Sequence, residues 1–431
     1  MVQAGRGRLQ PAAAAATLGR GAFRGRGGAA APARGRVPHG VRGGDAGRAP
    51  RADRGRRRGH RGRRARRADA GEGLVTRYVV IGAGAVGGAL AADLQLAGIP
   101  VVLAARGAAL AAIEDRGLIR ITPAGRRTVR LRVVGGPEAI ELTPRDALVL
   151  AVKTQDARDT LAAWAWRPVV DGGRTVGAAS GLPLFTLQNG LDAERVAARH
   201  FRTVHGTTVL VPARHLVPGE VLTGSAPRTG QLVVGGLPHP APPGEPGPAA
   251  VRFAEDAEAA GWVGRTVPEI SRWKAWKLLM NVTNAVEVFA GPADESAAVK
   301  RDAAAEAAAA LAAAGYRVAD PAAEGFPDPA LTRVVPGAGY VPGQQSTWQS
   351  FARGASSEVD FLNGEIVLIG RLHGVPTPVN EALQQLLAAS AAAGEPPGTR
   401  RVAEVTALAA ELARRADPTH AIAHTTGNPA T

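Results

Sequence analysis

The sequence predicts an α/β protein with a Rossmann-type dinucleotide-binding domain at residues 76–268 and an all-helical domain at residues 269–415. A glycine-rich turn joins a short apolar run to a helical stretch, which is how a nucleotide-binding βαβ unit begins. Further continuous apolar runs follow, as expected of parallel strands that are buried on both faces. Beyond Ser271 the chain is rich in alanine and leucine, has helical periodicity and lacks clear alternating strands.

The excess positive charge of the chain lies at its N-terminus. The 431 residues carry a net charge of +15, and residues 1–75 contain 19 arginines, no lysine and four acidic residues. The remainder is neutral, with 33 basic and 33 acidic residues. An Arg/Gly/Ala-rich segment with few large apolar side chains does not bury enough surface to fold. We therefore predict a disordered leader at residues 1–75, and a flexible tail at residues 416–431.

Two interpretations of the leader remain open. An arginine–glycine arm can contact nucleic acid through its phosphates. Alternatively, the segment is upstream sequence attached by a wrongly chosen start, which we favour because residues 74–78 run directly into the first predicted strand. A nucleic-acid-binding protein is the less expected function, since all binding would rest on the leader.

Composition argues against several other classes of protein. The chain has no cysteine, which rules out disulfides and thiolate chemistry and fits a reducing compartment. Its nine histidines are scattered without close metal-type spacing, so we predict no metal site. No apolar run approaches the ~20 residues that a membrane-spanning helix needs. We therefore expect no association with a membrane.

The glycine-rich turn follows the apolar run at residues 78–81 and precedes a helix that we predict at residues 89–97. Its glycines at 82, 84 and 87 have the GxGxxG spacing. The first permits a tight turn, the second lets a pyrophosphate approach the backbone, and the third lets helix and strand pack closely. The predicted cofactor-binding residues of this turn are Gly82, Ala83, Gly84, Ala85, Val86 and Gly87.

A second apolar strand is predicted at residues 100–105 and ends at Arg106. In NAD-preferring sites an acidic residue near this point binds the ribose hydroxyls, whereas an arginine suits a 2′-phosphate. No acidic residue lies between Gly98 and Arg106, so we predict NADPH as the cofactor. The alternative is that Arg106 is a solvated residue at the start of a helix.

Two more buried strands are predicted at residues 147–152, followed by Lys153, and at residues 183–187, followed by Gln188-Asn189-Gly190. Ligands of open α/β sheets bind beyond the carboxyl ends of the strands, so Lys153 and Asn189 lie on the binding edge. The second segment is equally compatible with an ordinary turn in which Asp192 caps the next helix. A mixed region with β character at residues 203–212 and 220–236 comes next, followed by a proline- and glycine-rich loop at residues 237–248.

Lysine is rare, and its placement on one predicted helix is unusual. The chain has four lysines against 48 arginines, and two of them, Lys274 and Lys277, lie within one helical turn. On a regular helix, Lys277, Asn281 and Asn284 form one polar stripe. A solvated helix face is the alternative, but lysine differs from arginine because desolvation readily lowers its pKa, so that it can donate a proton near neutral pH.

In this order the motifs resemble those of the ketopantoate reductase (2-dehydropantoate 2-reductase) family, from about residue 76 to about residue 415. The matching segments are the glycine turn, Arg106, Val152-Lys153-Thr154, Gln188-Asn189-Gly190, Gly206-Thr207-Thr208, Lys277 with Asn281, Ser346 twelve residues before Glu358, and Glu358 to Gly364 followed by His373 to Pro378.

The resemblance implies an NADPH-dependent reduction of a 2-keto acid to a 2-hydroxy acid in the cytoplasm, with ketopantoate as the best single substrate and pantothenate biosynthesis as the setting. By this resemblance Lys277 is the general acid. Asn189 and Glu358 position cofactor, lysine and substrate, while Asn281 and Ser346 hold the substrate. A possible homodimer is implied as well.

Three positions depart from the family pattern. The second helix asparagine is replaced by Ala285, with Asn284 one position earlier as its expected substitute in substrate binding. An acidic residue is replaced by Ser350, and Pro212 lies where the nicotinamide end of the cofactor is usually contacted. These departures leave open a different branched or bulkier 2-keto acid as the substrate.

Overall fold

The computed structural model describes residues 75–237, 246–337, 339–355 and 357–416. Residues 1–74 of the predicted leader, residues 417–431 of the predicted tail and residues 238–245 of the predicted loop lie outside these ranges.

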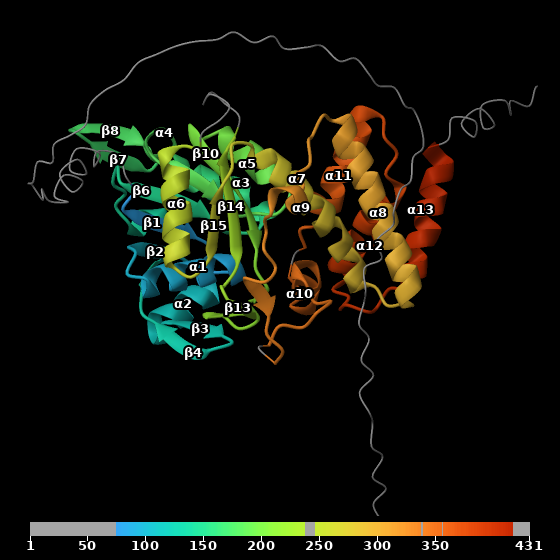
Figure 1. Cartoon of the computed structure of the whole chain (residues 1–431), viewed down its shortest axis with the longest axis horizontal. Coiled ribbons are helices and arrows are strands. Elements are labelled where there is room, and N and C mark those ends of the chain that lie inside the picture. The colour runs from blue at the N-terminus through green and yellow to red at the C-terminus, as the bar shows by residue number, and fades with distance from the viewer. Residues whose placement is uncertain (1–74, 238–245, 338, 356, 417–431) are drawn as a thin grey trace, which may run out of the picture. The chain divides into compact units, whose positions relative to one another are not determined.

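Eight strands form the central sheet in the order β15-β14-β10-β9-β6-β1-β2-β5 (Figure 1). All neighbours are parallel except β10 and β14, which are antiparallel. The strands are β1 (Arg77–Ile81), β2 (Val101–Ala104), β5 (Arg132–Val134), β6 (Asp146–Leu150), β9 (Pro183–Thr186), β10 (Thr203–Leu210), β14 (Gln231–Gly236) and β15 (Val263–Thr266).

Numbered along the chain, the first six strands of this sheet lie in the order 3-2-1-4-5-6, which is the Rossmann arrangement. The predicted fold class is therefore confirmed for the described residues. The predicted strands are continuous apolar runs, without alternating polar residues, because both faces of the sheet are covered.

Successive residues of β1 point to opposite faces of the sheet and enter different apolar cores. Tyr78 and Val80 pack with residues of α1 and α6, whereas Val79 and Ile81 pack with residues of α3 and α5. The helices of this part are α1 (Ala85–Leu96), α2 (Gly107–Arg116), α3 (Thr154–Ala165), α4 (Ala178–Gly181), α5 (Asp192–Ala198), α6 (Pro248–Ala259) and the short 3-10 helix η1 (Pro137–Ala139).

Helix α1 begins at Ala85, four residues before the predicted start at Ala89. The sequence assigned residues 82–88 to the turn because they contain four glycines. Packing explains why a glycine lies in the first turn of this helix. A Cβ atom at Gly87 would approach the carbonyl oxygen of Gly82 to 2.2 Å and the Cβ of Ala151 to 2.7 Å.

The remaining strands are short, and of these only β12 and β13 lie within the predicted region of β character at residues 220–236. They form a four-stranded sheet in the order β11-β12-β3-β4 and two separate pairs, β7–β8 and β13–β16. Their bounds are β3 (Leu118–Thr122), β4 (Gly125–Val129), β7 (Pro168–Asp171), β8 (Arg174–Gly177), β11 (Ala213–Arg214), β12 (Glu220–Thr223), β13 (Ser225–Pro227) and β16 (Thr332–Val334).

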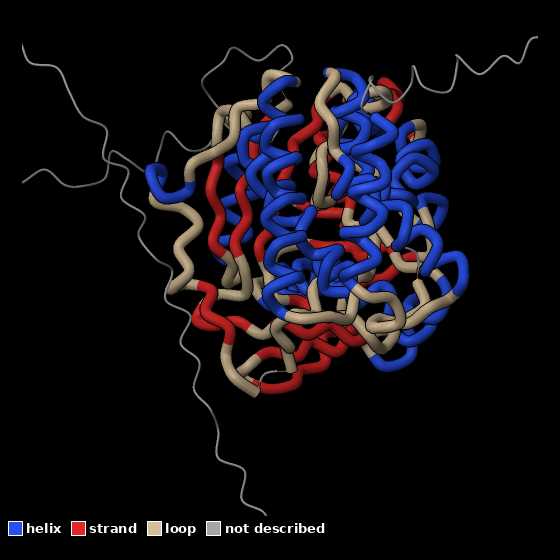
Figure 2. Tube along the Cα trace, turned by 90° about the vertical axis from the view of Figure 1, so that its right-hand side faces the viewer, coloured by secondary structure: helices blue, strands red, loops and turns tan. Residues whose placement is uncertain are grey.

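The C-terminal part is helical, as predicted, with the three-residue strand β16 as its one exception among the described residues. Its helices stand in front of the sheet when the molecule is viewed from their side (Figure 2). They are α7 (Ile270–Asn281), the 3-10 helix η2 (Val282–Val288), α8 (Ala293–Ala313), α9 (Pro321–Glu324), α10 (Ser346–Ala352), α11 (Val359–His373), α12 (Pro378–Ala393) and α13 (Val402–Ala416).

Glycine and proline define the ends of the long helices. Helix α11 ends at Gly374 and α12 at Gly394, both with positive φ, where a side chain is disfavoured. Helix α12 starts with Pro378, whose missing N–H removes no helical hydrogen bond at that position. Gly374 thus marks the end of α11, and Glu358 flanks its N-terminus.

The buried His205 on β10 makes the stability of this fold sensitive to pH. Its ring stacks on Phe185 at 4.9 Å, and neither ring nitrogen has a hydrogen-bond partner among the described residues. Burial lowers the pKa of His205 to about 4, from 6.5. The unfolded chain therefore takes up a proton near pH 6.5 that the folded protein resists until about pH 4. The stability that the folded protein gains by keeping His205 neutral is therefore fully present above pH 6.5 and is lost as the pH falls toward 4.

We expect the free energy of unfolding of the wild type to fall by about 2 kcal/mol more than that of His205→Phe between pH 7.5 and pH 5. The phenyl ring keeps the stacking on Phe185 and has no proton to bind. Urea denaturation at both pH values measures the difference. Equal losses in the two proteins would contradict a buried neutral imidazole.

Candidate active site

A cavity of about 650 Å³ lies at the carboxyl edge of the central sheet, with α7, α10 and the start of α11 opposite. It is lined by residues that directly follow β1, β2, β6 and β9, as expected for an open α/β sheet. Of the residues predicted for the site, all but Gly87 line this cavity. They are Gly82, Ala83, Gly84, Ala85, Val86, Arg106, Lys153, Asn189, Lys277, Asn281, Asn284, Ser346 and Glu358.

The three glycines of the turn have different surroundings. Gly82 has a φ of +117°, and a Cβ there would come within 2.8 Å of the backbone of Ala151. At Gly84 a Cβ would meet nothing within 4 Å, so the backbone at this point borders open space. Gly87 packs the helix on the sheet. An open cradle at the N-terminus of α1, where backbone N–H groups have no helical partner, fits a diphosphate.

Arg106 follows β2 and precedes α2, where it is the N-terminal flanking residue without making a side-chain cap. Its side chain is exposed and lines the cavity. It has no hydrogen bond or ion pair within the described part of the chain. Both predicted interpretations of its position therefore apply at once, because Arg106 is at a helix start and also borders the cavity.

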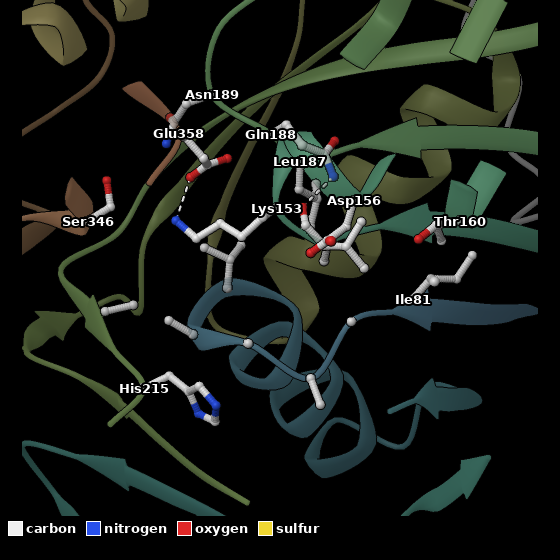
Figure 3. Close-up of a pocket in the computed structure, with 18 of the residues that line it drawn as sticks. Ile81, Lys153, Asp156, Thr160, Leu187, Gln188, Asn189, His215, Ser346 and Glu358 are labelled. Atoms are coloured by element: carbon white, nitrogen blue, oxygen red, sulfur yellow. Dashed lines mark hydrogen bonds and ion pairs between the residues drawn. The ribbon is translucent and has the colours of Figure 1, made fainter. Parts of the chain in front are cut away.

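Glu358 connects the helical part to the sheet (Figure 3). Its Oε2 accepts a hydrogen bond from Lys153 Nζ at 2.5 Å. Its Oε1 accepts from the backbone N of Thr154 at 3.1 Å and from Thr154 Oγ1 at 2.9 Å. Burial alone would raise the pKa of Glu358, but the charge of Lys153 and these hydrogen bonds outweigh burial and hold the pKa below its ordinary value. Glu358 is therefore an ionised carboxylate at neutral pH.

The segment after β9 is held from several sides. The side-chain amide of Gln188 donates to the carbonyl oxygens of Leu150 and Val152, at 3.1 and 2.9 Å, and so joins the ends of β9 and β6. Gly190 has a φ of +82°, and a Cβ there would lie 2.6 Å from the carbonyl oxygen of Phe361 in α11. Asn189, between them, is half-buried and lies beside Glu358 in the cavity (Figure 3).

The alternative role for Asp192 as a helix cap is wrong. Asp192 is the first residue of α5, the flanking position is Leu191, and no side chain caps this helix. The carboxylate of Asp192 accepts instead from Arg195 at 3.2 Å. The bonds that keep Asn189 in place therefore come from other elements.

Lys277 is half-buried on α7, borders the cavity and has no hydrogen-bond or ion-pair partner among the described residues. Burial lowers the pKa of Lys277 to about 8. Asn281, one turn later, also lines the cavity, and its Oδ1 atom is buried without a hydrogen-bond partner among the described residues. An unpaired buried amide oxygen beside an ammonium group is suited to a polar ligand.

The predicted polar stripe on a regular helix is wrong beyond Asn281, because α7 ends there and the chain tightens into the 3-10 helix η2. Asn284 nevertheless lines the cavity, whereas Ala285 belongs to the apolar core of the helical part. Ser350 is buried and donates to the carbonyl oxygen of Ser346 at 3.0 Å. Neither Ala285 nor Ser350 is therefore part of the cavity lining.

Lys274 does not line the cavity. It is buried and pairs with Glu194 at 2.7 Å. The spacing puts both lysines near one face of the helix, and the asparagine stripe and the family resemblance selected Lys277. Further cavity residues were not predicted. Those from the segments around β11 and α10 are His215, Tyr340, Gln345, Gln349 and Arg353.

These two segments meet through hydrogen bonds between residues that are far apart in the sequence. Arg353 Nη1 donates to the carbonyl oxygen of His215, and Gln349 Nε2 donates to that of Ala213 at 3.3 Å. No local pattern indicates such pairings. In the described ranges no group of three His, Asp or Glu side chains could hold a metal ion. No described helix has the length and apolar character of a membrane span.

Comparisons with known proteins agree with this architecture. Residues 78–238 match the family model Ketopantoate reductase PanE/ApbA, and residues 269–391 match its C-terminal model. A 2-dehydropantoate 2-reductase of Caulobacter vibrioides is 32% identical over 333 residues, which cover 74% of this chain and 100% of that protein.

Two solved structures illustrate the likeness of the fold. The PanE/ApbA family ketopantoate reductase from Ralstonia eutropha is 26% identical, with a TM-score of 0.58, and the match covers 74% of this chain and 99% of that one. D-mandelate dehydrogenase, in a ternary structure with NADH and anilino(oxo)acetate, is 20% identical with the same TM-score and the same coverage.

Replacing Glu358 by alanine should lower the free energy of unfolding by about 2–3 kcal/mol, because it removes the partner of Lys153 and of the Thr154 amide. Glu411→Ala, which breaks an exposed pair with Arg415 on α13, is the control and should change stability by less than about 0.5 kcal/mol. Urea denaturation at pH 7 measures both. A Glu358 variant as stable as the control would show that the bridge adds nothing to the fold.

Proposed function

The chain belongs to the ketopantoate reductase (2-dehydropantoate 2-reductase) family of oxidoreductases, and on that basis we propose that it uses NADPH to reduce ketopantoate to pantoate. Reduction of a 2-keto acid is the reaction class that goes with this family. The observation that carries the proposal is Lys277, a lysine whose pKa is lowered to about 8 in the same cavity as the glycine turn. The proposed setting is pantothenate biosynthesis in the cytoplasm.

Lys277 is the proposed general acid. NADPH, when bound, supplies the hydride, and the substrate oxygen that receives negative charge needs a proton. With a pKa of about 8, Lys277 is mostly protonated at pH 7 yet can release its proton more easily than an ordinary lysine. Its positive charge also stabilises the negative charge that develops on the carbonyl oxygen.

The remaining cavity residues are proposed to hold the two ligands. The unpaired Oδ1 of Asn281 accepts a hydrogen bond from the substrate, and Asn284 and Ser346 complete the polar surroundings. Asn189 and the ionised Glu358 fix the boundary between cofactor and substrate. Lys153 is neutralised by Glu358, so we propose that it orients the site rather than attracts anions.

Arg106 is the proposed basis of a preference for NADPH. Its guanidinium has no acidic partner among the described residues, and it lies at the end of β2, where the adenosine ribose is bound in this fold. The 2′-phosphate of NADPH can accept a charge-assisted hydrogen bond from Arg106, whereas NADH has no phosphate at this position. The glycine turn provides the site for the diphosphate of either cofactor.

A different branched or bulky 2-keto acid is the second candidate substrate. Asn284 in place of an asparagine at 285 alters the outline of the substrate end of the cavity. Since D-mandelate dehydrogenase shares the fold, an aryl 2-keto acid should be among the substrates that are tested.

The full-length protein should oxidise NADPH in the presence of ketopantoate, and more slowly with pyruvate or an aryl 2-keto acid. Loss of absorbance of the reduced cofactor at pH 7 gives kcat and KM for each substrate. Another keto acid with a higher kcat/KM would replace ketopantoate as the substrate, and no turnover with any of them would overturn the proposed activity.

The same assay tests the cofactor preference. Arg106→Ala should weaken NADPH binding by about 10- to 100-fold and leave NADH nearly unchanged, because only NADPH has the 2′-phosphate. The nearby Arg116→Ala, whose side chain donates to the carbonyl oxygen of Pro218 and does not line the cavity, is the control. Equal losses for both cofactors would remove Arg106 as the phosphate contact.

Lys277→Ala should lower kcat by about 10²- to 10⁴-fold while the dissociation constant of NADPH stays nearly constant. In the wild type, kcat should fall as the pH rises through about 8, because the protonated ammonium is the active form. Steady-state kinetics from pH 6 to pH 9.5 measures this decline. A flat profile, or turnover by the alanine variant close to that of the wild type, would exclude Lys277 as the acid.

A further inference from the structure

The buried pair of Lys274 and Glu194 has no role in the reaction proposed above. Lys274 lies on α7 one turn before Lys277, and Glu194 lies on α5. Their charged atoms are 2.7 Å apart, and the side chains are only 4% and 3% exposed. An isolated buried ion pair adds little to stability, since desolvation offsets the attraction. Its retention in the core therefore calls for another explanation.

The contacts of the pair all lead to the segment that carries Asn189. Lys274 Nζ also donates to the carbonyl oxygen of Gln188, at 2.5 Å, the residue directly before Asn189. Glu194 Oε1 accepts in addition from Thr186 Oγ1 at 2.7 Å, at the last residue of β9. One ammonium group thus joins α7 to both ends of the turn between β9 and α5.

The space around the pair is closely filled. A Cβ atom at Gly206 on β10 would lie 3.2 Å from Ile270, the first residue of α7, and 3.4 Å from Cγ of Glu194. Glycine at this position lets α7 and α5 approach the strand together. This gives a physical role to the glycine of the Gly206-Thr207-Thr208 motif, which does not line the cavity.

The far side of the same turn is held through the buried carboxylate of Glu365. Arg195, next to Glu194, contacts Glu365 of α11 at 2.7 Å, and Gly190 packs against the backbone of Phe361. The turn is therefore held by α7 on one side and by α11 on the other. Of these two contacts, the one with α7 connects it to the helix that carries Lys277.

We propose that the Lys274–Glu194 pair is a positioning device that sets Lys277 and Asn189 at fixed places in one cavity. The inference rests on the proposed function for the roles of those two residues. Lys274 itself touches neither substrate nor cofactor, since it does not line the cavity. It acts through its hydrogen bond to the carbonyl oxygen of Gln188, and it fixes the position of α7 through its pair with Glu194.

The test replaces both charges at once, because either single change would leave a buried charge without its partner. In the double variant Lys274→Met and Glu194→Gln, methionine fills the volume of the lysine stem, and glutamine can still accept the hydrogen bond from Thr186. We expect a folded protein that binds NADPH with nearly the wild-type dissociation constant, because the glycine turn and Arg106 are unchanged. We expect kcat to fall by about 100-fold, as for a displaced catalytic group.

The control is a second buried pair in the same part of the chain. Arg120 and Asp93 are 2.8 Å apart, with side chains 1% and 8% exposed, and neither lines the cavity. The double variant Arg120→Met and Asp93→Asn removes a comparable buried charge pair at a distance from the site. Its kcat should stay within about twofold of the wild type, since distant sites do not couple. If kcat is the same in both double variants, the positioning role is overturned.

A second measurement does not need turnover. The chain has only four lysines, so the pH dependence of Lys277 acetylation can be followed by peptide mass spectrometry. Its midpoint should lie near 8 in the wild type and in the control variant. It should move toward the ordinary lysine value of about 10.4 when Lys274 and Glu194 are replaced, because a less well seated α7 leaves Lys277 more solvated. If the wild type reduces no 2-keto acid, the proposed function fails, while an unchanged midpoint in the Lys274/Glu194 variant would separately overturn the positioning role.

Discussion

The cavity depends on charged side chains that cross from the helical part to the carboxyl edge of the sheet. A parallel sheet with helices on both faces leaves this edge open, and apolar packing alone does not fix the orientation of a second layer of helices. Glu358 at the start of α11 reaches Lys153 and Thr154, and Lys274 on α7 reaches Glu194. These contacts are directional, so each helix is held in one orientation above the strand ends.

Charge pairing also separates the roles of the lysines. Lys153 and Lys274 each contact a carboxylate, so their charges are satisfied within the protein. Lys277 has no such partner, and desolvation lowers the pKa of Lys277 to about 8. Of the two lysines that line the cavity, Lys153 is paired with a carboxylate, and Lys277 is left as the ammonium that can respond to a ligand. Position in a network of charges, rather than residue type, distinguishes the proposed acid from the structural cations.

The sequence predicts the features that are local. The glycine turn, the four apolar strands and the stretch containing Lys277 each consist of neighbouring residues with one periodicity, so they can be located without a structure. Features that depend on contacts between distant segments could not be found in this way. The hydrogen bond from Arg353 to the carbonyl of His215 joins residues 138 positions apart, and the Lys274–Glu194 pair joins residues on two helices. The change from α7 to η2 was missed because residues 282–288 carry no proline or glycine to mark it.

The rarity of lysine in this chain now has a physical interpretation at both positions on α7. At 277 a guanidinium would stay protonated at any relevant pH and would not suit the proposed proton donation, for which a desolvated amine is suited. At 274 the acceptors are a single carboxylate oxygen and a single carbonyl oxygen, which converge on one point in a closely filled space. A compact ammonium suits such convergent acceptors, while the planar fork of arginine needs a wider, two-pronged partner such as the carboxylate of Asp93 beside Arg120. On α7, lysine provides a compact cation at 274 and a cation that can release its proton at 277. Arginine is suited to positions such as 120, where neither property is needed.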